Sequence, residues 1–172
     1  MTRRTPSPAP QGLAGQAGRY RDRIFDDRRH DPYQASGKTA GAVFCPDCGV
    51  VYADGRWRWG SAPEGAHAGV CPACRRARDR LPAGHLLLDG PFFAAHRAEL
   101  LRIARNEAEH ERSEHPMHRI MHIDEQDDRV DISTTDVHLP QRIGAALKRA
   151  CHGALQVQYG SDEYSVRVHW RR

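Results

Sequence analysis

The chain contains almost no lysine and no long apolar run. Of its 26 basic residues only Lys38 and Lys148 are lysine, and the net charge is +4. No apolar stretch approaches the about 20 residues needed to cross a bilayer. The N-terminus also lacks the apolar segment of a signal peptide. These absences predict a cytoplasmic protein without membrane association, while the preference for arginine is by itself typical of biased codon use.

A complete phosphate-binding loop is also missing. Gly37-Lys38-Thr39 matches the end of such a loop, but the position that requires the first glycine is Pro32. Proline has no N–H to offer a phosphate, and no strand-like apolar run precedes it. We therefore expect no nucleotide cofactor.

Four of the five cysteines form two matched Cys-x-x-Cys pairs with 22 residues between them. This spacing is typical of a zinc ribbon, in which two tight turns direct four thiolates at one tetrahedral ion. The alternatives are two disulfides, which need an oxidising compartment, or a redox dithiol, which needs only one pair. The pattern favours one structural Zn²⁺, because four protein ligands leave no open position for a substrate. The expected ligands are Cys45, Cys48, Cys71 and Cys74.

The composition divides the chain into three parts. Residues 1–40 are rich in Pro, Gly, Gln and Arg without periodicity, which predicts a disordered basic arm. Residues 41–82 form the predicted zinc ribbon, with an aromatic hairpin over residues 50–59 and a loop over residues 61–69. A break at residues 81–84 separates it from residues 90–172, the predicted α+β domain.

Periodicity predicts the elements of this second domain. A helix is expected over residues 90–114 and a hairpin over residues 120–133. A second helix follows over residues 136–153, and a second hairpin joins residues 155–159 to residues 164–170. This order, helix-hairpin-helix-hairpin, predicts a two-layer α+β fold with helices covering one face of an antiparallel sheet. Cys151 lies on the apolar face of the second helix and is expected to be a buried thiol.

Alternation along the last strand separates apolar from polar side chains. The side chains expected to face the helices are Tyr164, Val166, Val168 and Trp170. The polar side chains between them in the same strand then lie on the open face, together with Gln156 and Gln158. Such a face is either simply solvated, which the pattern slightly favours, or an RNA platform, and it lacks the exposed aromatic residues that stack bases. Together with the arm and the ribbon, it supplies these candidate nucleic-acid-binding residues: Arg21, Arg23, Arg56, Arg58, Arg75, Arg76, Arg78, Arg80, Arg167, His169 and Arg171.

The histidines near the end of the first helix do not match a catalytic metal motif. The residue four positions after His110 is Glu114, so His-Glu-x-x-His is not met. Pro116 interrupts the helix that would hold His115 and His118 on one face. A charged helix end followed by a polar strand explains this segment, and we expect no catalytic residues and no enzymatic activity.

Three segments carry a resemblance to known proteins. CPDCGVVYADGRWRWG with CPAC, ISTTDVHLPQRIGAALKRA and the final VRVHWRR resemble an uncharacterised bacterial zinc-ribbon family over nearly the whole chain. Members of that family are sometimes labelled ATPases, a function that the incomplete phosphate-binding loop does not support. The paired cysteine turns ahead of an α+β domain are also similar to the N-terminal part of the archaeal and eukaryotic adaptor that exports the large ribosomal subunit. That adaptor has more cysteine turns than this chain, so the resemblance extends only to the four cysteines.

These features predict a non-enzymatic, zinc-stabilised protein that binds RNA, with a ribosome as one possible location. The basic arm, the arginines beside the second cysteine pair and the basic sheet face support this hypothesis together. The alternative is a protein-interaction adaptor in which Tyr52, Trp57 and Trp59 form an apolar contact patch.

Overall fold

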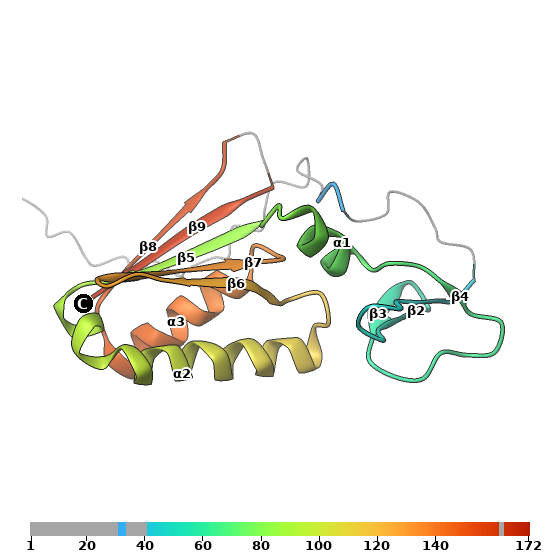
Figure 1. Cartoon of the computed structure of the whole chain (residues 1–172), viewed down its shortest axis with the longest axis horizontal. Coiled ribbons are helices and arrows are strands. Elements are labelled where there is room, and N and C mark those ends of the chain that lie inside the picture. The colour runs from blue at the N-terminus through green and yellow to red at the C-terminus, as the bar shows by residue number, and fades with distance from the viewer. Residues whose placement is uncertain (1–30, 34–40, 162–163) are drawn as a thin grey trace, which may run out of the picture.

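The smaller of two β-sheets lies in the N-terminal part of the described chain. The structure is a computed structural model that describes residues 31–33, 41–161 and 164–172 (Figure 1). The strands of the small sheet are ordered β3-β2-β1-β4, and a short helix, α1, follows them. The bounds are β1 (Val43–Phe44), β2 (Val51–Ala53), β3 (Arg56–Arg58), β4 (His67–Ala68) and α1 (Pro72–Asp79).

The small sheet confirms the predicted hairpin and adds two elements to it. Strands β2 and β3 pair antiparallel, as expected. Strand β4 lies within the segment predicted as a loop, and it pairs parallel with β1. The basic run after the second cysteine pair belongs to α1, which the sequence pattern did not predict. Cys71 caps this helix through its sulfur, which accepts a hydrogen bond from the Cys74 N–H, and Pro72 occupies the first turn.

The larger sheet has five strands in the order β6-β7-β5-β9-β8. Helix α2 follows β5 in the chain, and helix α3 follows β7. The central strand β5 contradicts two expectations: the segment before residue 90 is a strand, and the sheet is mixed because β5 pairs parallel with β9. Its apolar run Leu86–Leu88 is too short to show a period, as is usual for a strand buried at the centre of a sheet. The bounds are β5 (Gly84–Asp89), α2 (Pro91–Glu114), β6 (Ile120–Glu125), β7 (Arg129–Thr134), α3 (Leu139–Cys151), β8 (Ala154–Tyr159) and β9 (Val166–Arg171).

Helices α2 and α3 cover one face of this sheet and form the main core with it (Figure 1). Val166, Val168 and Trp170 are buried against the helices, which confirms the predicted alternation along β9. Cys151 is also buried, as expected. The largest fully buried side chains from the two helices are Phe93, Leu100, Leu139, Ile143 and Leu147.

Only a short part of the predicted arm falls within the described residues. The Asp31 carboxylate pairs with Arg76, and the Tyr33 hydroxyl donates a 2.7 Å hydrogen bond to Asp79. Residues 31–33 therefore contact α1 and are not a free arm. Arg21, Arg23 and the Gly37-Lys38-Thr39 sequence lie outside the described residues.

Candidate metal centre and adjoining cavity

The four cysteines of the two Cys-x-x-Cys pairs meet at one point. Their sulfur atoms all lie within 4.8 Å of one another, and all five cysteines of the chain are free. The Cys48 and Cys71 sulfurs are 3.7 Å apart. A disulfide would require about 2.05 Å, whereas four sulfurs at about 2.3 Å from a tetrahedral ion are separated by about 3.8 Å. Cys45, Cys48, Cys71 and Cys74 can therefore hold a metal ion, as the spacing predicted.

Backbone geometry prepares these thiols for a ligand role. Gly49 has a φ of +78°, and its N–H donates a 2.8 Å hydrogen bond to the Cys45 carbonyl, which closes the first turn. The Cys71 N–H donates to the Cys45 sulfur at 3.4 Å. Burial acts to raise the pKa of Cys45, but hydrogen bonds from backbone N–H groups, led by that of Cys71, lower it to about 7. Burial raises the pKa of Cys74 to about 11 and that of Cys71 further, so these two thiols need a nearby cation to become thiolates.

Arg119 also belongs to the cysteine site. It lies directly before β6, within residues 84–172, called the larger domain here, whereas the cysteines lie within residues 41–80, called the ribbon. Its guanidinium donates to the Cys48 sulfur at 3.3 Å and to the Cys74 sulfur at 3.4 Å, and it lies 4.0 Å from the Cys71 sulfur. Its Nε donates to the Pro116 carbonyl at 2.6 Å, which fixes the direction of the side chain. Burial acts against the charged guanidinium, yet the neighbouring thiolates raise the pKa of Arg119. The site therefore holds a fixed positive charge from outside the ribbon.

Further contacts join the ribbon to the larger domain around this arginine. Two guanidinium groups lie over the Trp59 ring, that of Arg112 at 5.3 Å and that of Arg119 at 5.6 Å from its centre. The Trp59 Nε1 donates to the Arg112 carbonyl at 2.7 Å. Met117 packs against the small core that contains Cys45 and Cys71. The ribbon and the larger domain thus share the surroundings of the cysteines.

The predicted nucleic-acid-binding residues do not all remain available. Arg76 is only 4% exposed, and its guanidinium pairs with Asp31 and lies 4.3 Å from the centre of the Tyr33 ring. Arg76 is therefore a structural residue here and not a surface contact. Arg58 pairs with Asp54, and Arg78 pairs with Asp47. Among the described residues, no carboxylate pairs with the exposed side chains of Arg56, Arg75 and Arg80.

The open face of the larger sheet differs in charge from the prediction. Strand β5 places Asp89 beside the predicted basic residues, where it pairs with His169 at 3.0 Å and with Arg171 at 3.6 Å. Asp131 of β7 lies 2.9 Å from His85 of β5 on the same face. Strand β5, which the prediction left out, contributes Asp89 to this face. The face therefore carries mixed charge and is not uniformly basic.

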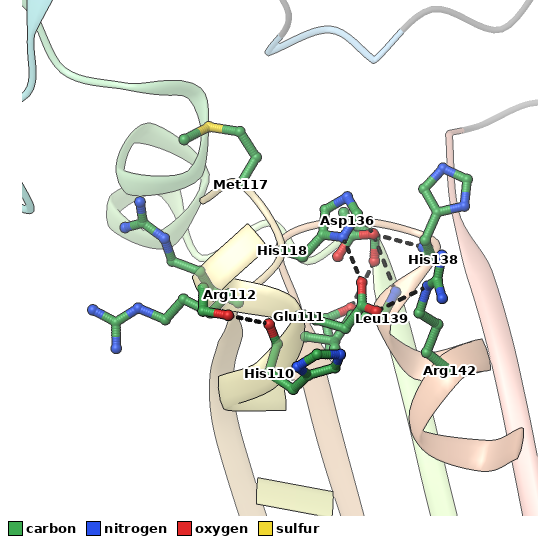
Figure 2. Close-up of polar contacts among 12 residues, drawn as sticks. His110, Glu111, Arg112, Met117, His118, Asp136, His138, Leu139 and Arg142 are labelled. Atoms are coloured by element: carbon green, nitrogen blue, oxygen red, sulfur yellow. Dashed lines mark hydrogen bonds and ion pairs between the residues drawn. The ribbon is translucent and has the colours of Figure 1, made fainter. Parts of the chain in front are cut away.

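A buried polar cluster lies at the end of α2, where the sequence suggested only a charged helix end (Figure 2). His118 lies between two buried carboxylates, with Nδ1 at 3.3 Å from Glu111 and Nε2 at 3.6 Å from Asp136. Arg142 of α3 neutralises Glu111 through a 3.2 Å contact. Burial raises the pKa of Asp136 and lowers that of His138. The cluster joins α2 to the start of α3 within the larger domain.

Asp136 has one oxygen in use and one without a partner. Its Oδ2 accepts hydrogen bonds from the backbone N–H groups of His138 at 2.6 Å and Leu139 at 3.1 Å, which caps α3 (Figure 2). Its Oδ1 is buried and accepts no hydrogen bond from the described residues. An unsatisfied buried acceptor is unfavourable unless a ligand, an ion or a water supplies a donor.

A cavity of about 560 Å³ separates the ribbon from this cluster. Tyr52 and Trp57 line it from the small sheet, Arg75 lines it from α1, and His118 and Asp136 line it from the larger domain. The two ring centres of Tyr52 and Trp57 are 5.3 Å apart. A cavity of this size, with both aromatic and polar side chains in its walls, is a candidate binding site.

Sequence reasoning missed several of these functional candidates. Arg119 has no motif around it, and its contact with the cysteines depends on packing between parts of the chain that are 45 and 71 residues apart. Asp136 carried a signal as a helix start, but nothing in the pattern indicates its unpartnered oxygen. His118 was singled out among the histidines, without its carboxylate neighbours.

In comparisons with protein-family models, curated proteins and solved structures, none matched this chain. Within the described residues, no helix has both the length and the apolar character to cross a membrane.

Proposed function

We propose that the four cysteines hold one structural Zn²⁺. The all-sulfur donor set and the close approach of the four sulfurs support zinc over oxygen-preferring ions such as Mg²⁺ and Ca²⁺. The ion would supply folding free energy to a ribbon whose own core is small, and the four cysteines would leave it no position for a substrate. Metal analysis of the purified protein tests this: one zinc per chain is expected, and a redox-active metal or no metal contradicts it.

We further propose that the zinc-stabilised protein is a non-enzymatic RNA-binding protein of the cytoplasm. The observation that carries this proposal is the group of exposed arginines Arg56, Arg75 and Arg80 on the ribbon and α1. Of these, Arg75 borders the cavity that Tyr52 and Trp57 line, so one unpaired cation and two aromatic rings share its wall. This combination is typical of proteins that bind single strands, in which arginines contact phosphates and aromatic rings stack on bases.

The adaptor alternative stays a prediction. Trp57 and Trp59 are partly buried and pack against the core of the ribbon, and Tyr52 contacts Trp57. Only the parts of Tyr52 and Trp57 that line the cavity remain for contact with a partner. The resemblance to bacterial zinc-ribbon proteins and to the ribosomal export adaptor is compatible with RNA binding and remains a prediction, as does a location on the ribosome.

Salt-dependent RNA binding tests the proposed function. We would measure the fluorescence anisotropy of a labelled single-stranded RNA at several salt concentrations, with the triple variant Arg56→Ala, Arg75→Ala and Arg80→Ala. Three lost phosphate contacts should reduce the slope of log affinity against log salt by about 2, at about 0.7 per contact. The matched control removes the same charge from the exposed Arg102, Lys148 and Arg149 on the two helices of the larger domain.

Two results would contradict RNA binding through these arginines. One is the absence of salt-dependent binding in the wild-type protein. The other is an equal loss of affinity in the ribbon variant and in the control variant, because this would show that only the net charge matters.

A further inference from the structure

We propose that the outer edge of β8 pairs with the same edge of a second copy of the chain, so that two five-stranded sheets join into one across a two-fold axis. Strands β8 and β6 form the two margins of the larger sheet (Figure 1). Among the described residues, no strand pairs with the outer side of either margin. Alternate residues of a margin strand direct their N–H and C=O groups outwards, where another strand can bind them. This inference depends neither on RNA binding nor on the metal.

The two margins differ in whether their sequence opposes such pairing. The pairing of β6 with β7 shifts register between Ile120 and His122, and β6 ends with the carboxylates Asp124 and Glu125. Irregular pairing and charged side chains are the features by which natural sheets prevent edge-to-edge association. Strand β8 pairs with β9 without interruption from Ala154 to Tyr159 and contains no charged residue and no proline. The sequence therefore protects one margin of the sheet and leaves the other able to pair.

Strand β8 also exposes apolar side chains on the side of the sheet that the helices cover. Val157 lies opposite the buried Val168, and Tyr159 lies opposite the buried Val166. Directly opposite residues of paired strands share a face, yet Val157 is 41% exposed and Tyr159 is 44% exposed. In the described part of the chain, the one other large hydrophobic residue that is exposed is Leu81. A partner strand on this edge would cover the apolar surface that β8 leaves in water.

The pattern of β8 fits a second copy of itself. A two-fold axis pairs the strand with its own reverse, and because opposite residues share a face, one residue must lie opposite its own copy. The strand reads Leu-Gln-Val-Gln-Tyr from Leu155 to Tyr159, which gives the same order of apolar and amide side chains in both directions. With Val157 at the axis, Leu155 lies opposite Tyr159 on the apolar side. Gln156 then lies opposite Gln158 on the open side, where their amides can hydrogen-bond each other.

The neighbouring register fits less well. With Gln156 at the axis, Ala154 would lie opposite Gln158, and Tyr159 would extend beyond the paired residues. The Val157 register instead pairs every apolar side chain from residue 155 to residue 159 with another apolar side chain. We therefore place Val157 at the axis, where the side chains of the two copies meet.

Helix α3 limits how much of β8 its own chain can cover. A Cβ at Gly144 would lie 2.7 Å from Leu155 Cδ1, so the helix packs closely over the start of the strand. Farther along, the Tyr159 hydroxyl donates a 3.0 Å hydrogen bond to Gln141, which fixes the ring beside the helix. In the joined sheet, the α3 helices of the two copies would flank the paired strands. The apolar side chains of both β8 strands would fill the groove between these helices.

Sedimentation velocity of the nuclease-treated protein tests the pairing, because nuclease removes RNA that could bridge two chains. We expect a dimer whose fraction rises with protein concentration up to about 100 µM. Val157→Lys and Val157→Glu should each weaken the dimer by about ten-fold or more, because like charges would lie directly opposite at the axis. An equal mixture of the two variants should form a heterodimer, because opposite charges then face each other.

The matched controls are His122→Lys and His122→Glu, which introduce the same charges at an exposed position of β6 on the other margin. They should leave the dimer unchanged. Thermal melts of each variant alone establish that it is folded, and the exposure of Val157 means that a charged side chain can reach water in the monomer.

Four results would overturn the proposal. The first is a wild-type protein that stays monomeric at about 100 µM. The second is a dimer that neither substitution of Val157 weakens, since another surface would then form it. The third is an equal weakening by the His122 variants. The fourth is a pair of Val157 variants that stay monomeric when mixed, because this would show that the two copies of residue 157 do not lie opposite each other.

Discussion

Replacing Arg119 by alanine tests whether the metal centre extends beyond the ribbon. The variant removes a guanidinium that lies 3.3 Å from the Cys48 sulfur and 3.4 Å from the Cys74 sulfur. The proposed zinc ion with four thiolates would have a net charge of −2, and the Arg119 guanidinium contacts the sulfurs that would hold it. We therefore expect the variant to bind zinc more weakly than the wild-type protein.

The magnitude follows from two opposing contributions. Unit charges about 4 Å apart attract by about 4 kcal/mol at an effective dielectric constant of about 20. The loss of hydration by the partly buried guanidinium offsets much of this attraction. Polar groups that contact metal ligands are typically worth about 10- to 100-fold in metal affinity, or about 1.4–2.7 kcal/mol. Arg119→Lys should lie between alanine and the wild type, because it keeps the charge but loses the two-pronged geometry.

A competition titration against a chromophoric zinc chelator at constant pH measures the affinity. The matched control is Arg112→Ala, because Arg112 also lies over the Trp59 ring but donates to no cysteine sulfur among the described residues. Wild-type affinity in Arg119→Ala would refute the reasoning. Equal weakening in both variants would also refute it, since the effect would then come from the contacts of Trp59 and not from the thiolates.

Three further predictions concern folding. Removal of the metal with a chelator should raise amide exchange in residues 41–80 and leave the five-stranded sheet protected, because that sheet has its own core; uniform loss of protection would contradict this. Cys151→Ser should lower the free energy of unfolding by about 1–3 kcal/mol through a buried hydroxyl. The same variant should not change the zinc-to-protein ratio, and a lower ratio would make Cys151 a ligand. Gly84→Ala should lower the free energy of unfolding by about 1–3 kcal/mol, because a Cβ would lie 2.5 Å from both Pro140 Cγ and Thr134 Oγ1; an unchanged denaturant midpoint would refute this close approach.

Sequence patterns that lie within one element were sufficient to predict α2, α3 and β9. The helix predicted over residues 90–114 corresponds to α2, and the spacing of apolar residues around Ile143 and Leu147 predicted α3. Strict alternation along β9 identified its buried side chains, because successive residues of a strand face opposite sides. Each of these signals lies within one element and needs no partner to be read.

The predictions were wrong where the structure of a segment depends on the segments that pair with it. Strand β5 consists of a short apolar run whose identity depends on its pairing with β7 and β9. Its absence from the prediction produced the incorrect antiparallel sheet. Without this strand, the prediction also left out Asp89, which pairs with two residues of the face predicted to be basic. Arg76 looked like a surface cation, yet Asp31, 45 residues away, pairs with it in the interior.

The sequence by itself determined that four cysteines form one site, because two Cys-x-x-Cys turns can each direct only their own sulfurs and a tetrahedral ion requires both. Only the tertiary structure decided what surrounds that site. Arg119 reaches the sulfurs, and Asp136 faces the ribbon across the cavity, because the ribbon packs on the larger domain. The physical reason is that ligand spacing is set by bond lengths along a few residues, whereas charge neutralisation and cavities depend on surfaces brought together from distant parts of the chain.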